Sequence, residues 1–295
     1  MTKLVLIAMP GNEQMASALA ALTGGEVAEL EMRRFPDQET YLRLRTDVTS
    51  RSVAIVCTLD RPDSKFLPLA FTAAMARDLG AARVGLVAPY LAYMRQDCRF
   101  KDGEAITSSY FARLISSSFD WLVTVDPHLH RHASLDEIYA IPGQAVHAHA
   151  ALSRWIRNNV TDPLIIGPDS ESVQWVSRIA TDAQCPYVVL TKRRLGDRDV
   201  KIDMPDMSAW QGRQPVLVDD VISSAATMIE AARRLTAAGM PKPVCVGIHG
   251  LFADDSYGLL RRVAAHIATT NTVSHDSSEI DLSELLADAI ISMAA

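Results

Sequence analysis

The sequence predicts an α/β fold built from parallel sheets flanked by helices, and two features of the chain support this class. Short runs of β-branched and other apolar residues alternate with Ala-rich amphipathic segments along the whole 295-residue chain, which is typical of parallel strands joined by helical crossovers. Most of these runs are too apolar to alternate with polar residues, as expected of strands covered on both faces. We therefore expect buried parallel sheets.

The expected strands are the short apolar runs. In chain order they are Leu4–Met9, Val53–Cys57, Val84–Val87, Leu122–Val125, Leu164–Ile166, Val188–Leu190, Val216–Val218, Val244–Ile248 and Ala265–Ala268. The first of them lacks the small-residue cleavage pattern of a signal peptide, so we interpret it as a buried strand.

The expected helices are the amphipathic segments between these strands, and several of them end at a glycine, such as Gly80 or Gly239. In chain order they are Glu13–Leu22, Lys65–Leu79, Ser108–Ser117, Ala148–Arg157, Ser170–Thr181, Thr227–Ala238 and Leu282–Ile290.

A faint internal repeat suggests two similar α/β domains. A helix ending at Gly80 and the strand after it resemble a helix ending at Gly239 and its following strand, about 160 residues later. A generic helix–glycine–strand unit would give the same pattern. The turn-rich stretch 141–144 is the best boundary, which predicts domains 1–144 and 145–295. The last helix could pack back on the N-terminal domain.

Charge and hydropathy exclude several classes of protein. Lys and Arg number 29 against 35 Asp and Glu, a net charge of -6, which argues against binding to nucleic acid or to an anionic membrane by bulk attraction. No stretch approaches the roughly 18 continuous apolar residues of a membrane helix. The four cysteines are far apart and form no C-x-x-C pair, which suits reduced thiols in a cytoplasm. We expect a cytoplasmic protein.

The strongest motif follows the strand Val216–Val218. Asp219 and Asp220 come at the carboxyl end of this strand, and a hydroxyl-rich turn then opens a helix, at the position where open α/β sheets bind ligands. The N–H groups and the dipole of a helix N-terminus favour a phosphate, and the Asp pair can accept hydrogen bonds from sugar hydroxyls. From the turn alone, an ordinary strand end followed by a helix cap is an equally good interpretation.

This turn resembles the ribose-5-phosphate-binding loop of the type I phosphoribosyltransferase fold, and further motifs along the chain resemble the ribose-phosphate pyrophosphokinase family. Residues 100–108 continue one of these motifs in a form similar to the archaeal branch of the family. The order and number of these motifs make chance similarity implausible. They are Arg34-Phe35-Pro36-Asp37-Gln38-Glu39, Pro89-Tyr90-Leu91-Ala92-Tyr93-Met94-Arg95-Gln96-Asp97, Val125-Asp126-Pro127-His128, Gly167-Pro168-Asp169-Ser170, Lys192-Arg193-Arg194, His249-Gly250-Leu251-Phe252 and Thr270-Asn271-Thr272.

The resemblance implies two domains of the type I phosphoribosyltransferase fold and one reaction. The diphosphoryl group of ATP would pass to the anomeric hydroxyl of ribose 5-phosphate, giving phosphoribosyl pyrophosphate and AMP, with magnesium (Mg2+) as cofactor. By resemblance, the metal ligands are His128 and Asp169. Without the resemblance, His128 would more often be a surface histidine and Asp169 a helix cap.

The resemblance also assigns the remaining site residues. It makes Lys192 the catalytic lysine, Arg194 a second catalytic cation and the hairpin at Phe35 part of the neighbouring subunit's site, which implies a homo-oligomer, a dimer or larger. To stabilise the charge on the phosphoryl group, the two cations only need to stay charged. The alternative interpretation of this basic segment is a solvated charged loop without a catalytic role. The nucleotide-binding residues are Phe35, Asp37, Gln38, Glu39, Arg95 and Gln96, and the ribose-5-phosphate-binding residues are Asp219, Asp220, Ser223, Ser224, Ala225, Ala226 and Thr227.

The phosphate loop departs from the family pattern at Ala225 and Ala226, where small flexible residues are usual. Because alanine resists a positive φ, we expect the loop to keep a right-handed backbone, with the two methyl groups beside the phosphate. Such a loop is compatible with a second hypothesis, in which the protein is a degenerate relative that regulates an active synthetase. The retained His128, Asp169 and Lys192 argue against this hypothesis. The third hypothesis is a phosphoribosyltransferase, although such an enzyme would not need the nucleotide motifs.

Overall fold

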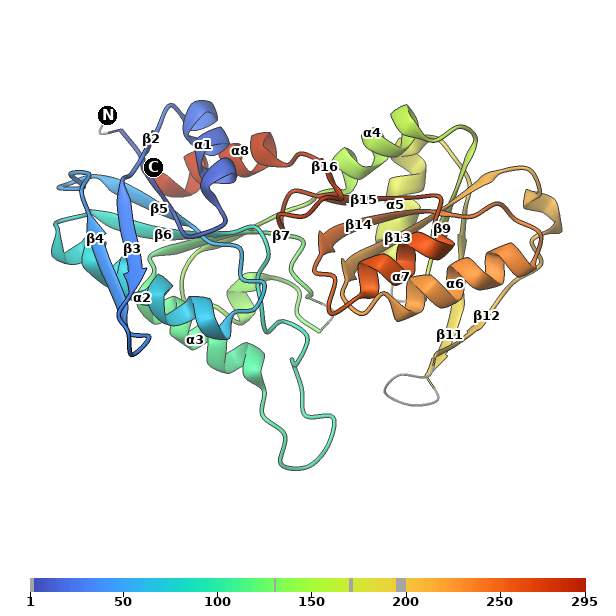
Figure 1. Cartoon of the computed structure of the whole chain (residues 1–295), viewed down its shortest axis with the longest axis horizontal. Coiled ribbons are helices and arrows are strands. Elements are labelled where there is room, and N and C mark those ends of the chain that lie inside the picture. The colour runs from blue at the N-terminus through green and yellow to red at the C-terminus, as the bar shows by residue number, and fades with distance from the viewer. Residues whose placement is uncertain (1–2, 130, 170–171, 195–199) are drawn as a thin grey trace. The chain divides into compact units, whose positions relative to one another are not determined.

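The computed structural model describes residues 3–129, 131–169, 172–194 and 200–295 (Figure 1). The chain forms two compact units. The first unit takes the residues up to Val146 and also the C-terminal segment Leu282–Ala295, whereas the second unit is continuous from His147 to Asp281.

The first unit is built on a six-stranded sheet with the order β2-β1-β5-β6-β7-β8, in which every neighbouring pair is parallel. An antiparallel hairpin of β3 and β4 forms a separate sheet. The strands are β1 Val5–Ala8, β2 Glu26–Val27, β3 Leu30–Arg34, β4 Thr40–Leu44, β5 Ser52–Val56, β6 Arg83–Ala88, β7 Trp121–Val125 and β8 Gly143–Val146. The helices are α1 Glu13–Thr23, α2 Asp63–Asp78, α3 Thr107–Ser118 and α8 Ser283–Ala294, with a 3-10 turn at Leu135–Glu137.

Close packing around Trp121 explains a glycine in a central strand of this sheet. The Trp121 side chain is fully buried on β7, next to Gly85 of the paired strand β6. A Cβ atom on Gly85 would lie 1.9 Å from the indole ring. Any larger residue at position 85 would therefore displace the indole and disrupt the core.

The second unit repeats the plan of the first, with a parallel six-stranded sheet of order β10-β9-β13-β14-β15-β16 and a separate antiparallel ribbon of β11 and β12. The strands are β9 Pro163–Gly167, β10 Tyr187–Val189, β11 Thr191–Arg194, β12 Val200–Asp203, β13 Gln214–Ile222, β14 Val244–Gly250, β15 His266–Thr270 and β16 Ser278–Ile280. The helices are α4 His149–Asn159, α5 Val173–Ala183, α6 Ala226–Ala237 and α7 Ser256–Val263, with a 3-10 turn at Ser208–Trp210.

The predicted α/β class with parallel sheets is confirmed, and every expected strand and helix has a counterpart in the described chain. The turn expected at residues 141–144 is shorter than this stretch, because strand β8 begins at Gly143 and pairs with β7. A Cβ atom at Gly143 would approach Leu135 to 3.1 Å, so this glycine allows close packing of the strand. Strands β3 and β4 form the hairpin that the family resemblance implied at Phe35. The elements that the sequence did not predict are β2, β8, β11, β12, β16 and α7.

Two of the four cysteines are buried. Burial raises the pKa of the Cys57 and Cys245 thiols to about 12, so both remain protonated at neutral pH. Cys98 and Cys185 are half-buried, and all four thiols are free.

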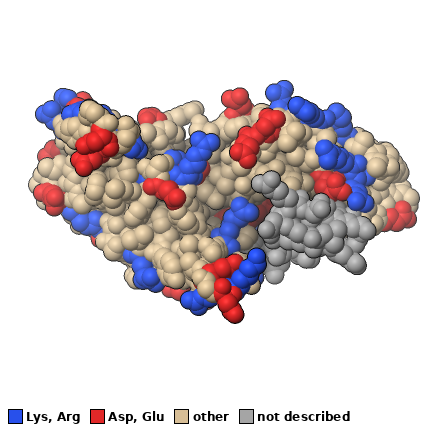
Figure 2. All heavy atoms as spheres, turned by 60° about the horizontal axis from the view of Figure 1, so that its bottom comes forward, with Lys and Arg blue, Asp and Glu red and all other residues tan. Residues whose placement is uncertain are grey.

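The described part of the chain contains no helix with the length and apolar character needed to cross a membrane. On the face drawn in Figure 2, acidic and basic side chains are interspersed, in agreement with the modest net charge of -6.

Candidate active site

The phosphate loop lies between strand β13 and helix α6 of the second unit. Strand β13 extends beyond the expected end and carries Asp219 and Asp220 close to its last residue. The Asp219 carboxylate accepts the N–H of Asp220 at 3.1 Å, and the Asp220 carboxylate accepts the N–H of Val221 at 2.8 Å. Both side chains are half-buried. Each carboxylate is thus held against the backbone while part of its surface stays accessible.

The turn after β13 presents hydroxyl groups before the helix. Ser223 is half-buried, Ser224 is exposed, and Thr227 is half-buried in the first turn of α6. The first N–H groups of a helix have no partner within the helix. Together with the hydroxyls, they offer donors to an anion at this end of the sheet.

The expectation for Ala225 is wrong. Ala225 has a φ of 56° and a ψ of 8°, which is the left-handed region, and it is the N-cap of α6. Its side chain is only 6% exposed and packs in the hydrophobic cluster that includes Ile222 and Phe252. Packing therefore offsets the backbone cost of this conformation, and the Ala225 methyl lies in the core. Ala226 is exposed at the first residue of the helix.

Asp169 follows β9, the strand paired with β13. Since Ile166 pairs with Leu217 in this parallel sheet, Asp169 and Asp219 belong to the same carboxyl edge. The N-cap residue of α5 is Ser172, not Asp169, and the backbone carbonyl of Asp169 accepts hydrogen bonds from the Ser172 N–H at 3.2 Å and Oγ at 2.5 Å.

The two predicted catalytic cations lie on a strand, not in a loop. Lys192 and Arg194 belong to β11, where they pair with Ile202 and Val200 of the antiparallel strand β12. The chain is extended here because β11 and β12 form backbone hydrogen bonds with each other, and these bonds satisfy N–H and C=O groups that a loop would leave exposed. The rest of the predicted basic loop, residues 195–198, lies outside the described residues.

The predicted nucleotide hairpin is formed by β3 and β4 of the first unit, and the residues of its tip are exposed. At the tip the Phe35 N–H donates to the Glu39 carbonyl at 2.8 Å, and the Gln38 N–H donates to the Phe35 carbonyl at 2.9 Å. Gln38 adopts a φ of 75° to close this turn. The Asp37 carboxylate accepts the Glu39 N–H at 3.2 Å. The turn is therefore ordered by its own hydrogen bonds.

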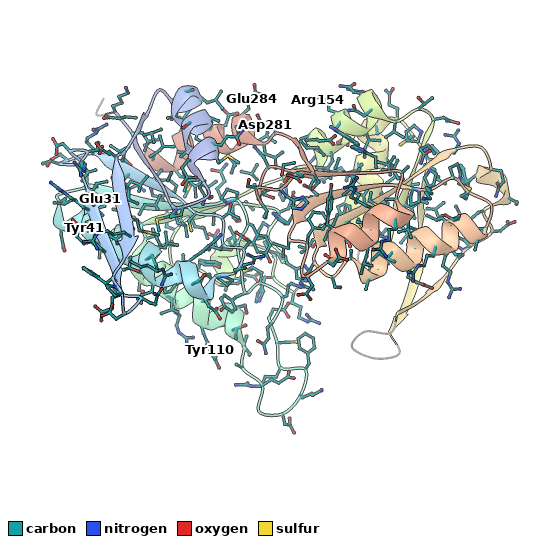
Figure 3. All side chains as sticks on the ribbon, in the orientation of Figure 1. Glu31, Tyr41, Tyr110, Arg154, Asp281 and Glu284 are labelled. Carbon is teal, nitrogen blue, oxygen red and sulfur yellow. The ribbon has the colours of Figure 1, made fainter. Side chains whose placement is uncertain are left out.

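One cation supports the aromatic side chain at this tip. The Arg33 guanidinium lies 4.8 Å from the centroid of the Phe35 ring and 4.1 Å from that of Tyr41, which is labelled in Figure 3. The two rings meet edge to face at 6.0 Å. Phe35 is still 39% exposed, so a flat base could stack on it.

The Arg95-Gln96 segment follows β6 of the same unit. Arg95 is exposed, whereas Gln96 is half-buried and accepts a hydrogen bond from the Thr107 hydroxyl at 3.0 Å. The next side chain, Asp97, is only 2% exposed and pairs with Arg131 at 2.8 Å. This ion pair connects the segment to the loop that contains His128, and the sequence did not assign it a role.

His128 lies in the loop after β7 and is half-buried. Within the described residues, no group of three or more His, Cys, Asp or Glu side chains could hold a metal ion. The predicted ligands are one imidazole and one carboxylate, and such a small set suits magnesium, which keeps several waters and is completed by substrate phosphates.

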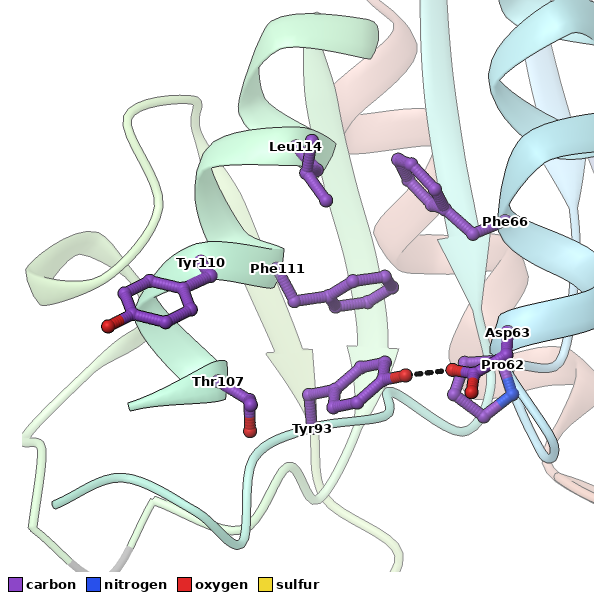
Figure 4. Close-up of a pocket in the computed structure, with 8 residues that line it drawn as sticks. All are labelled: Pro62, Asp63, Phe66, Tyr93, Thr107, Tyr110, Phe111 and Leu114. Atoms are coloured by element: carbon purple, nitrogen blue, oxygen red, sulfur yellow. Dashed lines mark hydrogen bonds between the residues drawn. The ribbon is translucent and has the colours of Figure 1, made fainter. Parts of the chain in front are cut away.

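A pocket that the sequence did not predict lies between α2 and α3 (Figure 4). Its volume is about 400 Å³, and Phe66, Tyr110 and Phe111 form much of its wall. The Tyr93 hydroxyl donates to the Asp63 carboxylate, which raises the pKa of Tyr93. Tyr93 has a φ of 61°, an uncommon backbone conformation for a bulky residue.

Comparisons with known proteins cover nearly the whole chain. Residues 4–118 match the N-terminal domain of ribose phosphate pyrophosphokinase, and residues 134–283 match the phosphoribosyl transferase domain. A ribose-phosphate pyrophosphokinase of Sulfolobus acidocaldarius is 30% identical over 97% of this chain and 100% of its own length. The enzyme of the same name from Methanothermobacter thermautotrophicus is 29% identical over 97% of this chain and 99% of its own.

The fold of a solved structure agrees with these matches. The phosphoribosylpyrophosphate synthetase of Mycobacterium smegmatis superposes with a TM-score of 0.85 at 21% identity, covering 98% of both chains. The predicted fold, the predicted enzyme class and the archaeal resemblance are thus confirmed. The chain belongs to the ribose-phosphate pyrophosphokinase family.

Proposed function

We propose that this chain transfers the diphosphoryl group of ATP to the anomeric hydroxyl of ribose 5-phosphate and releases AMP. The observation that carries the proposal is the presence of both family regions in one chain that matches its relatives over nearly their full length. In this reaction the anomeric oxygen attacks the β-phosphorus of ATP. The bond from that phosphorus to the oxygen shared with the α-phosphate breaks, AMP leaves with that oxygen, and the hydroxyl proton is released.

The second unit would hold the sugar phosphate. The donors between Ser223 and Thr227 would receive its 5-phosphate, and the half-buried carboxylates of Asp219 and Asp220 would accept hydrogen bonds from its ring hydroxyls. Such contacts fix the sugar at both ends and orient the anomeric hydroxyl, which is the main requirement of a phosphoryl transfer.

The first unit would supply nucleotide contacts. Phe35 would stack on adenine, and the carboxylates of Asp37 and Glu39 would accept hydrogens of its amino group. Arg95 and Gln96 would contact the ribose and phosphates of ATP. The exposed hairpin tip agrees with the proposal that it serves the site of a neighbouring subunit in a homo-oligomer.

Lys192 and Arg194 would stabilise the negative charge that spreads over the transferred group. Magnesium, held by His128 and Asp169 together with substrate oxygens and water, would neutralise phosphate charge when bound. The protein residues only need to orient the two substrates and neutralise phosphate charge, since the reaction requires no covalent intermediate with the protein.

Two alternative functions have less support. A phosphoribosyltransferase would not require the first 118 residues to match the N-terminal domain of ribose phosphate pyrophosphokinase. A degenerate regulatory relative was suggested by a hindered phosphate loop, but the Ala225 methyl is buried in the core and does not obstruct the loop.

The test is a direct assay of the purified chain with ATP, ribose 5-phosphate and magnesium. We expect equal amounts of AMP and phosphoribosyl pyrophosphate, and no formation of either when magnesium is removed by a chelator. ADP as the nucleotide product, or turnover without a divalent cation, would contradict the proposal.

A further inference from the structure

We propose that Ser256 is a positioning residue for the phosphate loop, a role that rests on the proposed function. Ser256 is the first residue of α7 and is only 4% exposed. Its hydroxyl donates to the backbone carbonyl of Ser223 at 2.9 Å. Neither residue type nor spacing in the sequence connects Ser256 with this loop, because the contact joins two separate loops at the carboxyl ends of β13 and β14.

Ser256 belongs to a short segment, Leu251–Ser256, that we call the brace. Its backbone donates three hydrogen bonds to the end of β13 and the start of the phosphate loop. The N–H groups of Leu251 and Phe252 reach the carbonyl of Ile222, the last residue of β13, at 2.9 and 3.0 Å, and the Ala253 N–H reaches the carbonyl of Ser223, the first residue of the loop, at 3.1 Å. The brace therefore fixes two successive carbonyls, each through two donors.

These fixed carbonyls determine where the neighbouring N–H groups point. In a trans peptide, the C=O and the N–H lie on opposite sides. Because the carbonyls of Ile222 and Ser223 point to the brace, the N–H groups of Ser223 and Ser224 point away from it. Two loop N–H groups are thus held away from the brace, and successive backbone donors of this kind can bind an anion.

The brace is itself held by packing. Phe252 is 7% exposed and lies in the hydrophobic cluster that also contains Ala225. Its ring contacts Tyr257 at 5.0 Å and His275 at 4.5 Å between centroids. Among the four donors to the loop, Ser256 is the one that acts through its side chain. A substitution can therefore remove this donor without changing the backbone.

The test compares Ser256→Ala with Ser283→Ala. Ser283 is also the first residue of a helix, is 3% exposed and donates to the Met15 sulfur, but it belongs to the first unit. We expect Ser256→Ala to raise the KM for ribose 5-phosphate by roughly 3- to 10-fold, as for one lost hydrogen bond. The KM for ATP should change less than about twofold, and Ser283→Ala should leave both constants unchanged.

The melting temperature of each variant separates positioning from general stability. A lower melting temperature with an unchanged KM for ribose 5-phosphate, or an equal rise of both KM values, would overturn the role of Ser256. If the wild-type chain binds ribose 5-phosphate by calorimetry but forms no AMP, the proposed reaction fails. The role of Ser256 is then judged by the same 3- to 10-fold change in the Kd of ribose 5-phosphate.

Discussion

Ala225 is the residue at which the phosphate loop departs most from the backbone that its type favours. A left-handed conformation costs an L-residue about 1–2 kcal/mol, and Ala225 has a φ of 56°. Burial of its methyl offsets part of this cost, at about 0.8 kcal/mol for one buried carbon. The remaining cost is roughly 0.2–1.2 kcal/mol, so the conformation is tolerated without glycine.

Replacing Ala225 by Gly should therefore change the free energy of unfolding by less than about 1 kcal/mol, because strain and buried surface are lost together. The matched control is Ala226→Gly at the exposed first residue of α6. Ala226→Gly relieves no left-handed strain, so it should lower the free energy of unfolding by about 0.5–1 kcal/mol.

Urea unfolding of the two variants measures both changes. A loss above about 2 kcal/mol for Ala225→Gly would mean that packing of the methyl, and not the balance described above, dominates at this position. The KM for ribose 5-phosphate should stay within about twofold of wild type for Ala225→Gly, because the N–H donors of the loop remain.

A second prediction at the residue scale concerns Lys192. If it stabilises the transferred phosphoryl group, Lys192→Ala should lower kcat by about 100-fold, or about 3 kcal/mol, with little change in the KM for ATP. Arg193→Ala is the control, since it removes the same charge from the adjacent position of β11. Steady-state kinetics with both substrates distinguish the outcomes. Equal effects of the two substitutions would show that only the bulk charge of the strand matters.

The resemblance to the family placed candidate residues along the sequence, but it could not give their local geometry. Ala225 illustrates why. Alanine alone predicts a right-handed backbone, and the observed conformation depends on a cluster that contains Phe252 from another loop. The Asp97–Arg131 ion pair is a similar case, because the sequence does not show which cation reaches the buried carboxylate.

At the scale of elements, apolar strands and long helices were predictable, and short polar elements were not. The β3–β4 hairpin contains Glu31, Arg33 and Arg43, so it lacks the apolar runs that identified the central strands. Helix α7 has only eight residues, near the lower limit at which helical periodicity can be recognised. Helix α7 begins at Ser256, whose hydroxyl contacts the phosphate loop, and function there competes with regular patterning.

The hairpin gives a prediction about subunits. If it serves a neighbouring site, mixing Phe35→Ala chains with Lys192→Ala chains should restore activity, because some sites receive an intact hairpin and an intact lysine. With random mixing of a symmetric dimer, about one quarter of all sites would be complete. Activity after subunit exchange, compared with each variant alone, measures the recovery.

The control for this experiment mixes Lys192→Ala with Arg95→Ala. If Arg95 and Lys192 serve the site of the same subunit, every site in the mixture keeps one defect and activity should stay low. Recovery in the control, or none with the hairpin variant despite verified exchange, would argue against a shared site.

At the scale of the whole molecule, the first unit is completed by the end of the chain. Helix α8 contacts α1 and β7, and its buried residues include Leu286, Ala289 and Ile290. The guanidinium of Arg83 also donates to the backbone carbonyl of the last residue, Ala295, at 2.6 Å. The stability of the first unit therefore depends on residues that the chain supplies only after the second unit.

Two adjacent leucines of α8 test this dependence. Leu286 is 0% exposed and Leu285 is 36% exposed. Leu286→Ala should lower the free energy of unfolding by about 2–5 kcal/mol, because it removes buried surface and leaves a cavity between α8 and the rest of the first unit. Leu285→Ala should lower the free energy of unfolding by less than about 1 kcal/mol, since leucine and alanine both favour a helix and little buried surface is lost.

Urea unfolding measures both changes in the free energy of unfolding. Limited proteolysis of the Leu286→Ala variant should release the second unit, His147–Asp281, as the more resistant part. Equal destabilisation by both substitutions, or preferential cleavage inside the second unit, would contradict a first unit that is held together by the C-terminal helix.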